Sequence, residues 1–187
     1  VSKLALGTGI AQLITILASP ILTRIFSPEQ YGIFALFISM ITILSVFSTF
    51  RYEYAIVLPK SKRRAEELYF LCIFITILVS ITFFLIAFLF GTKILIFLSF
   101  TSLNEYILLI PLSILLSGVT QTNDLWLNRN EEYKYMGFLR VIQSVAIVSL
   151  TILFGYVLST ATSLIIGNLI GMTILMIVGF VLLRRSI

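Results

Sequence analysis

Two arginines, Arg24 and Arg51, are the residues best suited to carry chemistry in this chain of 187 residues. Arg51 stands two positions before Glu53, and the apolar or neutral residues 54–59 separate this pair from the basic run Lys60-Ser61-Lys62-Arg63-Arg64. The spacing predicts that Arg51 and Glu53 lie inside a membrane helix. A charge there costs about 3 kcal/mol on insertion scales, which makes it a functional candidate by default.

The alternative for Arg51 is a structural ion pair with a residue on another helix. Two positions correspond to about 200° around an α-helix, so Arg51 and Glu53 are not expected to share one face. Arg24 follows Lys3 by about 31 Å of helix at 1.5 Å per residue, which places it near the outer interface if Lys3 lies at the inner one. The alternative for Arg24 is an interfacial side chain that only snorkels toward water.

The amino-acid composition indicates that the segments around these arginines lie in a membrane. The chain is 59% hydrophobic and 11% charged, with a mean hydropathy of +1.12. A soluble domain has about a quarter charged residues, and one of this size leaves much of its surface exposed to water. The sequence therefore predicts an all-α membrane protein with several spans. Its basic residues lie in short loops, so the net charge of +5 indicates topology and not a nucleic-acid partner.

Catalytic and metal-binding signatures are missing from the sequence. There is no histidine, and the single cysteine, Cys72, lies in an apolar run where it is expected to pack as a small hydrophobe. Paired mid-span carboxylates and phosphate-binding glycine loops are also absent. We expect neither an enzyme, nor a cofactor, nor a metal site.

The apolar runs predict six transmembrane helices that form one bundle. Their expected ranges are about 4–26, 28–58, 68–90, 103–127, 135–156 and 161–183. Ser27-Pro28-Glu29-Gln30 reads as a capping box that starts the second span, and Ser102-Leu103-Asn104-Glu105 as one that starts the fourth. Gly7 and Gly9 in the first span allow close helix approach, and the GxxxG pattern of Gly167 and Gly171 in the sixth favours close helix contact.

Polar residues recur at helical spacing along the fourth span, at Ser113, Ser117, Thr120, Gln121 and Asp124. A polar stripe on a membrane helix faces other helices or water, not lipid. Helix packing and the lining of a cavity both remain open as its explanation.

Basic residues predict the orientation of the bundle. With the N-terminus in the cytoplasm, 11 of the 13 lysines and arginines lie on the inner side, and only Arg24 and Lys93 lie on the outer side. Short cytoplasmic loops carry such an excess of positive charge. We expect a multi-pass protein with both termini in the cytoplasm.

The stretches ILTRIFSPEQYGIFALF and RYEYAIVLPKS resemble the O-antigen-type, Wzx-like flippases, which are polysaccharide biosynthesis proteins of the multidrug/oligosaccharidyl-lipid/polysaccharide exporter superfamily. Residues 126–144, WLNRNEEYKYMGFLRVIQS, resemble the segment between their fourth and fifth spans. The resemblance implies a two-lobed transporter that moves undecaprenyl-diphosphate-linked oligosaccharide across the bacterial cytoplasmic membrane. Six spans make one lobe, so the chain is expected to be an N-terminal lobe whose partner is a missing C-terminal lobe or a second copy.

The resemblance also implies a substrate site, because cationic side chains in the central cavity would hold the lipid diphosphate. Arginine suits this role, since its planar fork pairs with phosphate oxygens through two hydrogen bonds. The residues implied are Arg24 and Arg51, followed by Asn123, Arg129 and Arg140. Membrane lipid is the other expected partner. A drug or cation antiporter of the same superfamily and a non-transporting scaffold of glycan synthesis remain as alternatives.

Overall fold

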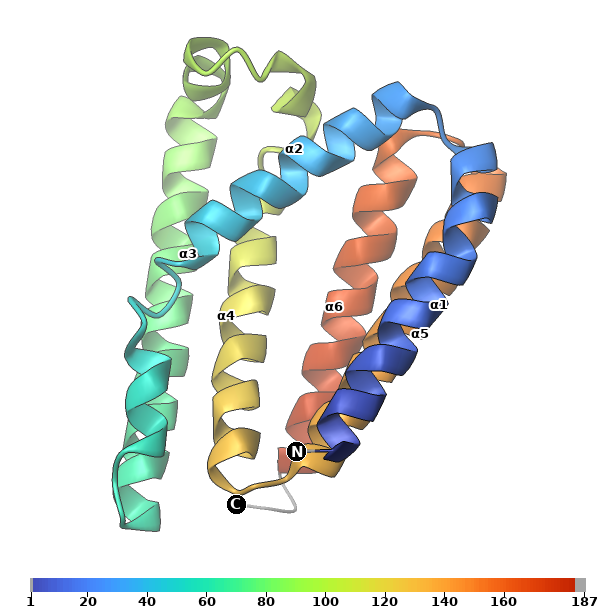
Figure 1. The fold of residues 1–187 in the computed structure, drawn as a ribbon. Coiled ribbons are helices and arrows are strands. Elements are labelled where there is room, and N and C mark those ends of the chain that lie inside the picture. Colours follow the sequence, from blue (N-terminus) through green and yellow to red (C-terminus); the bar gives the residue numbers. More distant parts are fainter. Residues whose placement is uncertain (1, 184–187) are drawn as a thin grey trace. The chain divides into compact units, whose positions relative to one another are not determined.

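Helices make up the fold of the computed structural model, which describes residues 2–183 (Figure 1). The α-helices are α1 (Ser2–Ile25), α2 (Pro28–Ser45), α3 (Lys62–Phe97), α4 (Leu109–Arg129), α5 (Tyr133–Val157) and α6 (Ala161–Leu183), with two 3₁₀ helices, η1 (Tyr52–Val57) and η2 (Thr101–Tyr106). No strand occurs among these residues. The predicted class, an all-α membrane protein, is confirmed.

Five of the described helices are long and apolar enough to cross a membrane: α1, α2, α3, α5 and α6. The predicted sixth span corresponds to α4, a helix of 21 residues that is not among the five. Its polar stripe accounts for the difference, because serine, threonine, glutamine and aspartate lower the mean hydropathy of any window along it. The predicted count of six spans is therefore not fully matched.

One compact unit contains α1, α5 and α6, from residues 1–34 and 126–187. A Cβ atom added to Gly7 would collide with the backbone of Gly137, so α1 and α5 touch almost backbone to backbone. Gly155, further along α5, lies against Ile25 and Phe26 at the far end of α1. These two contacts show that α1 and α5 run parallel and side by side (Figure 1).

The predicted GxxxG contact is confirmed in the same unit. Gly167 packs against Thr151 of α5, and Gly171 packs against Ile147, one turn earlier. Residue numbers rise along α6 while those of its contacts on α5 fall, so α5 and α6 are antiparallel. Since α1 is parallel to α5, the start of α1 and the end of α6 lie at the same end of this unit. Arg184 and Arg185, which were counted in the orientation, lie outside the described residues.

The predicted capping box at the start of α2 is also confirmed. The Ser27 N–H donates to Gln30 Oε1 at 2.8 Å, and the Gln30 N–H donates to Ser27 Oγ at 3.3 Å. Gln30 Nε2 then donates to the carbonyl of Ser159 at 2.5 Å. This last bond ties the α1–α2 turn to the α5–α6 turn and fixes the other end of the unit.

The second unit, residues 35–125, contains α3 and most of α4. Two hydrogen bonds of 2.8 Å join these helices, from Ser80 Oγ to the Pro111 carbonyl and from Tyr69 Oη to Asn123 Oδ1. The residue numbers fall along α3 as they rise along α4, so the helices are antiparallel.

The predicted second span, 28–58, is wrong in its second half, because α2 ends at Ser45. The hydroxyls of Ser45 and Ser48 bond to the carbonyls of Thr42 and Ser45, three residues earlier. Such local bonds compete with the α-helical ladder. The backbone continues as turns and η1, with Arg51 in the left-handed region at φ 63°.

The third and fourth spans differ from prediction at their ends. α3 begins at Lys62 and continues to Phe97, so it includes the residues that were expected to form loops on both sides of 68–90. Its 36 residues extend about 54 Å, which exceeds the ~30 Å hydrocarbon core. Ser102 to Glu105 form part of η2 and do not cap a helix; α4 starts at Leu109.

Cysteine labelling tests the predicted orientation. We expect Ser102→Cys, in a Cys72→Ala background, to react with a membrane-impermeant thiol reagent added to intact cells, because the segment after Lys93 should lie outside. Ser61→Cys, within the basic run, should react only after the membrane is permeabilised. Both serines are exposed, and Cys72 is buried, so accessibility within the protein does not limit the labelling. The reverse pattern would overturn the orientation.

Candidate functional site: a polar groove between α1 and α5

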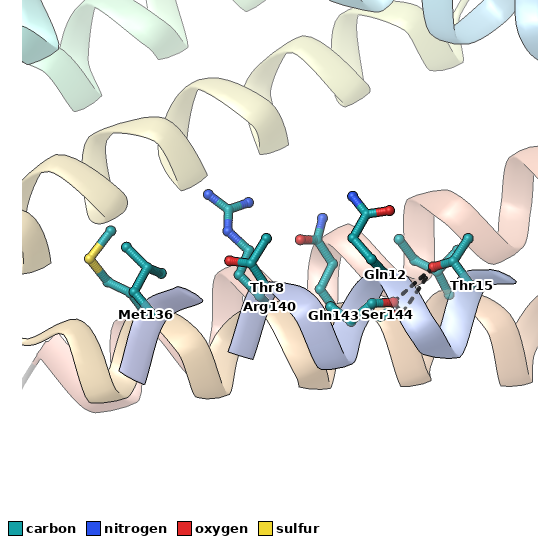
Figure 2. Close-up of a pocket in the computed structure, with 10 residues that line it drawn as sticks. Thr8, Gln12, Thr15, Met136, Arg140, Gln143 and Ser144 are labelled. Carbon is teal, nitrogen blue, oxygen red and sulfur yellow. Dashed lines mark hydrogen bonds between the residues drawn. The ribbon is translucent and has the colours of Figure 1, made fainter. Parts of the chain in front are cut away.

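A groove of about 560 Å³ runs between α1 and α5 (Figure 2). The residues that line it are Leu4, Thr8, Ala11, Gln12 and Thr15 from α1, and Met136, Arg140, Gln143, Ser144 and Ile147 from α5. Figure 2 shows the Arg140, Gln143 and Gln12 side chains pointing from the helix pair toward the same side. The groove thus joins one guanidinium to two carboxamides and three hydroxyls.

The hydroxyls of the groove also hold the two helices together. Ser144 Oγ donates to the Ala11 carbonyl at 2.8 Å, and Thr15 Oγ1 lies 3.2 Å from Ser144 Oγ. Thr15 Oγ1 donates to the Ala11 carbonyl as well, at 3.1 Å. These bonds fix the register of α1 on α5, and with it the level of Gln12 against Gln143.

Arg140 is a cation within a span. It lies seven residues after Tyr133, so about 10 Å along α5 from its start. The helix has 25 residues, about 37 Å, and a centred ~30 Å hydrocarbon core would begin about 4 Å from its end. The Cα atom of Arg140 then lies about 7 Å inside the core. Arg140 is counted with the inner-side residues in the orientation; a core centred on α5 would instead place it inside the membrane.

A second cavity, of about 360 Å³, lies beside the groove and shares Thr15, Ser144 and Ile147 with it. Its other lining residues come from α1, α2, α5 and α6: Ser19, Leu22, Tyr31, Phe34, Val148, Thr151, Leu164 and Asn168. We call it the Asn168 cavity. Because the two share walls, polar groups continue from the level of Arg140 toward the opposite end of α1.

Arg51 lies in the other unit, and its predicted geometry is wrong. It is not inside a helix, and its Nη1 lies 3.8 Å from Glu53 Oε1. The two residues reach each other because the backbone between them is a 3₁₀ turn and not an α-helix. Arg51 Nη1 also donates to Tyr54 Oη at 3.3 Å, and its side chain is 53% exposed.

Glu53 is the buried member of this pair. Its side chain is 2% exposed, and Thr49 Oγ1 donates to its Oε2. A carboxylate taken out of water needs such a donor and a counter-charge. The contacts of Arg51 therefore fit the structural ion pair that the sequence left open, although with Glu53 itself as the partner.

The other predicted site residues lie at separate places. Arg24 is exposed in the last turn of α1, where a cation is favourable to the helix dipole. Gly155 of α5 packs against this end of α1, and it follows Arg140 by 15 residues, about 22 Å along the helix. Arg129 is half-buried in the last turn of α4, and Asn123 is buried with its Oδ1 bonded to Tyr69. Of the five, only Arg140 lines the groove.

Sequence reasoning missed the uncharged members of the groove. The sequence feature that could have revealed them is a set of mostly polar residues repeated on one helix face. In α1 the spacing i, i+4, i+7 joins Thr8, Gln12 and Thr15. In α5 the same spacing joins Met136, Arg140 and Gln143. Two such stripes, on helices held together by Gly7 and Gly137, line the same groove.

Comparison with known families identifies the chain. No curated protein and no solved structure matches it significantly. A family model described as "Polysaccharide biosynthesis protein" matches residues 21–187, which include the end of α1 from Ile21 and all of α2 to α6. The match covers far more than half of the chain and agrees with the resemblance predicted from its motifs. This multi-pass, all-α membrane protein therefore belongs to the polysaccharide biosynthesis protein family.

Proposed function

We propose that the protein is a flippase that moves undecaprenyl-diphosphate-linked oligosaccharide across the bacterial cytoplasmic membrane, and that these helices are its N-terminal lobe. The observation that carries the proposal is Arg140, an arginine within a candidate membrane span that lines a polar groove. Family membership supplies the context of polysaccharide biosynthesis and transport. The second lobe would be further chain or a second copy.

The chemistry of the groove suits a diphosphate headgroup. A guanidinium stays charged in the membrane and presents five N–H donors, which is enough for a protein partner and a phosphate together. Gln12 and Gln143 add carboxamide donors on the same side (Figure 2). Thr8 and Gln12 are exposed on α1, so a headgroup can reach the groove from outside the helix pair. Arg24, Arg51, Asn123 and Arg129 remain proposed contacts of the substrate.

The lack of acidic residues in the lining of both cavities favours a flippase over a cation or drug antiporter. No aspartate or glutamate lines the groove or the Asn168 cavity. Cation coupling at membrane depth usually depends on such carboxylates. A cationic groove instead favours an anionic substrate.

Reconstitution of the full-length protein tests the proposed function. In vesicles that carry undecaprenyl-diphosphate-linked oligosaccharide in one leaflet only, we expect the protein to make the sugar accessible to an impermeant lectin in the other leaflet. The same lipid in protein-free vesicles is the control. A rate equal to that control, from protein that is folded and correctly inserted, would refute the proposal.

A further inference from the structure

The Asn168 cavity contains a buried polar atom that the fold does not satisfy. Asn168 is 9% exposed, and its side-chain Oδ1 accepts no hydrogen bond from any described residue. A buried acceptor without a donor is destabilising, and such groups are rare in proteins. The Oδ1 atom itself has less than 1 Å² of exposed surface, but Asn168 lines a 360 Å³ cavity, so a turn of its carboxamide lets a ligand or water that enters supply the donor.

The position of Asn168 in α6 shows that helix packing does not require an asparagine there. It follows Gly167, whose missing side chain lets α6 press against Thr151 of α5. Leucine or alanine at 168 would satisfy this packing without leaving an unpaired carbonyl. Helix packing alone therefore does not account for an asparagine here.

The lining of the cavity indicates the kind of ligand. None of its eleven residues is charged, which disfavours both a phosphate and a divalent cation. Hydroxyls of Thr15, Ser19, Tyr31 and Thr151 occur there with the Asn168 carboxamide, beside apolar surfaces of Leu22 and Phe34. Neutral hydroxyls and carboxamides, together with an aromatic ring, suit a ligand that carries hydroxyl or amide groups on a partly apolar ring.

We propose that the Asn168 cavity binds the first sugars of the lipid-linked oligosaccharide, with Asn168 Oδ1 accepting a hydrogen bond from a sugar hydroxyl or amide. This inference rests on the proposed function and divides the site in two. The groove at Arg140 holds the diphosphate, and the adjoining cavity, which shares Thr15 and Ser144 with it, holds the sugar attached to that diphosphate. Selectivity for the sugar then depends on α6.

The test compares two lipids on the full-length protein in detergent. We expect Asn168→Leu to weaken binding of undecaprenyl-diphosphate-linked oligosaccharide on the order of tenfold, since it removes the acceptor and fills space. Binding of undecaprenyl diphosphate without sugar should not change. Thr173→Val is the matched control on α6, because the Thr173 hydroxyl bonds to the Leu169 carbonyl of its own helix and does not line the cavity.

The other possible outcomes would reject either the sugar site or the flippase function. Equal weakening for both lipids, or none for either, would reject the sugar site and leave a structural or water-filled cavity. Wild-type protein that binds both lipids equally would also reject it, while the flippase function stands. Wild-type protein that binds neither lipid would reject the proposed function itself. Thermal unfolding of each variant, expected at a temperature no lower than that of the wild type, shows that the loss is not one of folding.

Discussion

Arg140→Ala is expected to abolish glycan export while leaving the amount of protein in the membrane near normal. Hydrogen bonds to charged groups contribute about 1.5–3 kcal/mol, so loss of the guanidinium should weaken binding of the lipid diphosphate by about 10- to 100-fold. Arg140→Lys should restore export only in part, because an ammonium keeps the charge but loses the bidentate fork. Complementation of a strain without its own flippase, with immunoblots of membranes, measures both quantities.

Lys134→Ala is the matched control for Arg140. Lys134 is exposed near the start of the same helix, at the same end of the unit, and does not line the groove. If any nearby positive charge sufficed, both variants would lose export to the same extent. If the groove binds the diphosphate, Lys134→Ala exports normally. Normal export by Arg140→Ala would exclude Arg140 from the substrate site.

Strongly apolar spans could be predicted from the sequence almost to the residue. α6 was expected at 161–183 and lies at Ala161–Leu183, since a short turn and the end of the apolar run bound it on both sides. Hydropathy failed where local hydrogen bonds decided the backbone. Uncharged residues continue through Ser45, Ser48 and Thr49, so the run still looked like a span, but serine bonds to nearby carbonyls end α2 there.

The candidate site could be predicted only in part, for a related reason. Charges stand out in an apolar sequence, and Arg140 was among those selected. Gln12, Gln143 and Asn168 are uncharged, and their importance depends on which helix lies opposite. Asn168 stands inside the GxxxG pattern of Gly167 and Gly171, and the close contact of that pattern with α5 is what places this residue in a cavity wall. A single helix does not contain that information.

Arg51→Ala is expected to lower the amount of folded protein, because it leaves the Glu53 carboxylate without its counter-charge. Glu53 is 2% exposed, so a destabilisation of about 2 kcal/mol is expected, although the half-exposed site of Arg51 lets water replace part of the interaction. Arg51→Ala combined with Glu53→Gln should recover the folded amount. The neutral amide removes the stranded charge and still accepts the bond from Thr49. Fluorescence-detected size-exclusion chromatography after heating measures each variant.

The double variant also separates the two roles of Arg51 that the sequence left open. Recovery of folded protein together with export would confine Arg51 to the ion pair. Recovery of folded protein without export would mean that its guanidinium also contacts the diphosphate, as the resemblance to flippases predicts. A single variant as stable as the wild type would contradict the structural pair, since a carboxylate this buried should not lose the guanidinium beside it without cost. Arg24→Ala provides the comparison, because Arg24 is exposed at a helix end and its loss should leave stability unchanged.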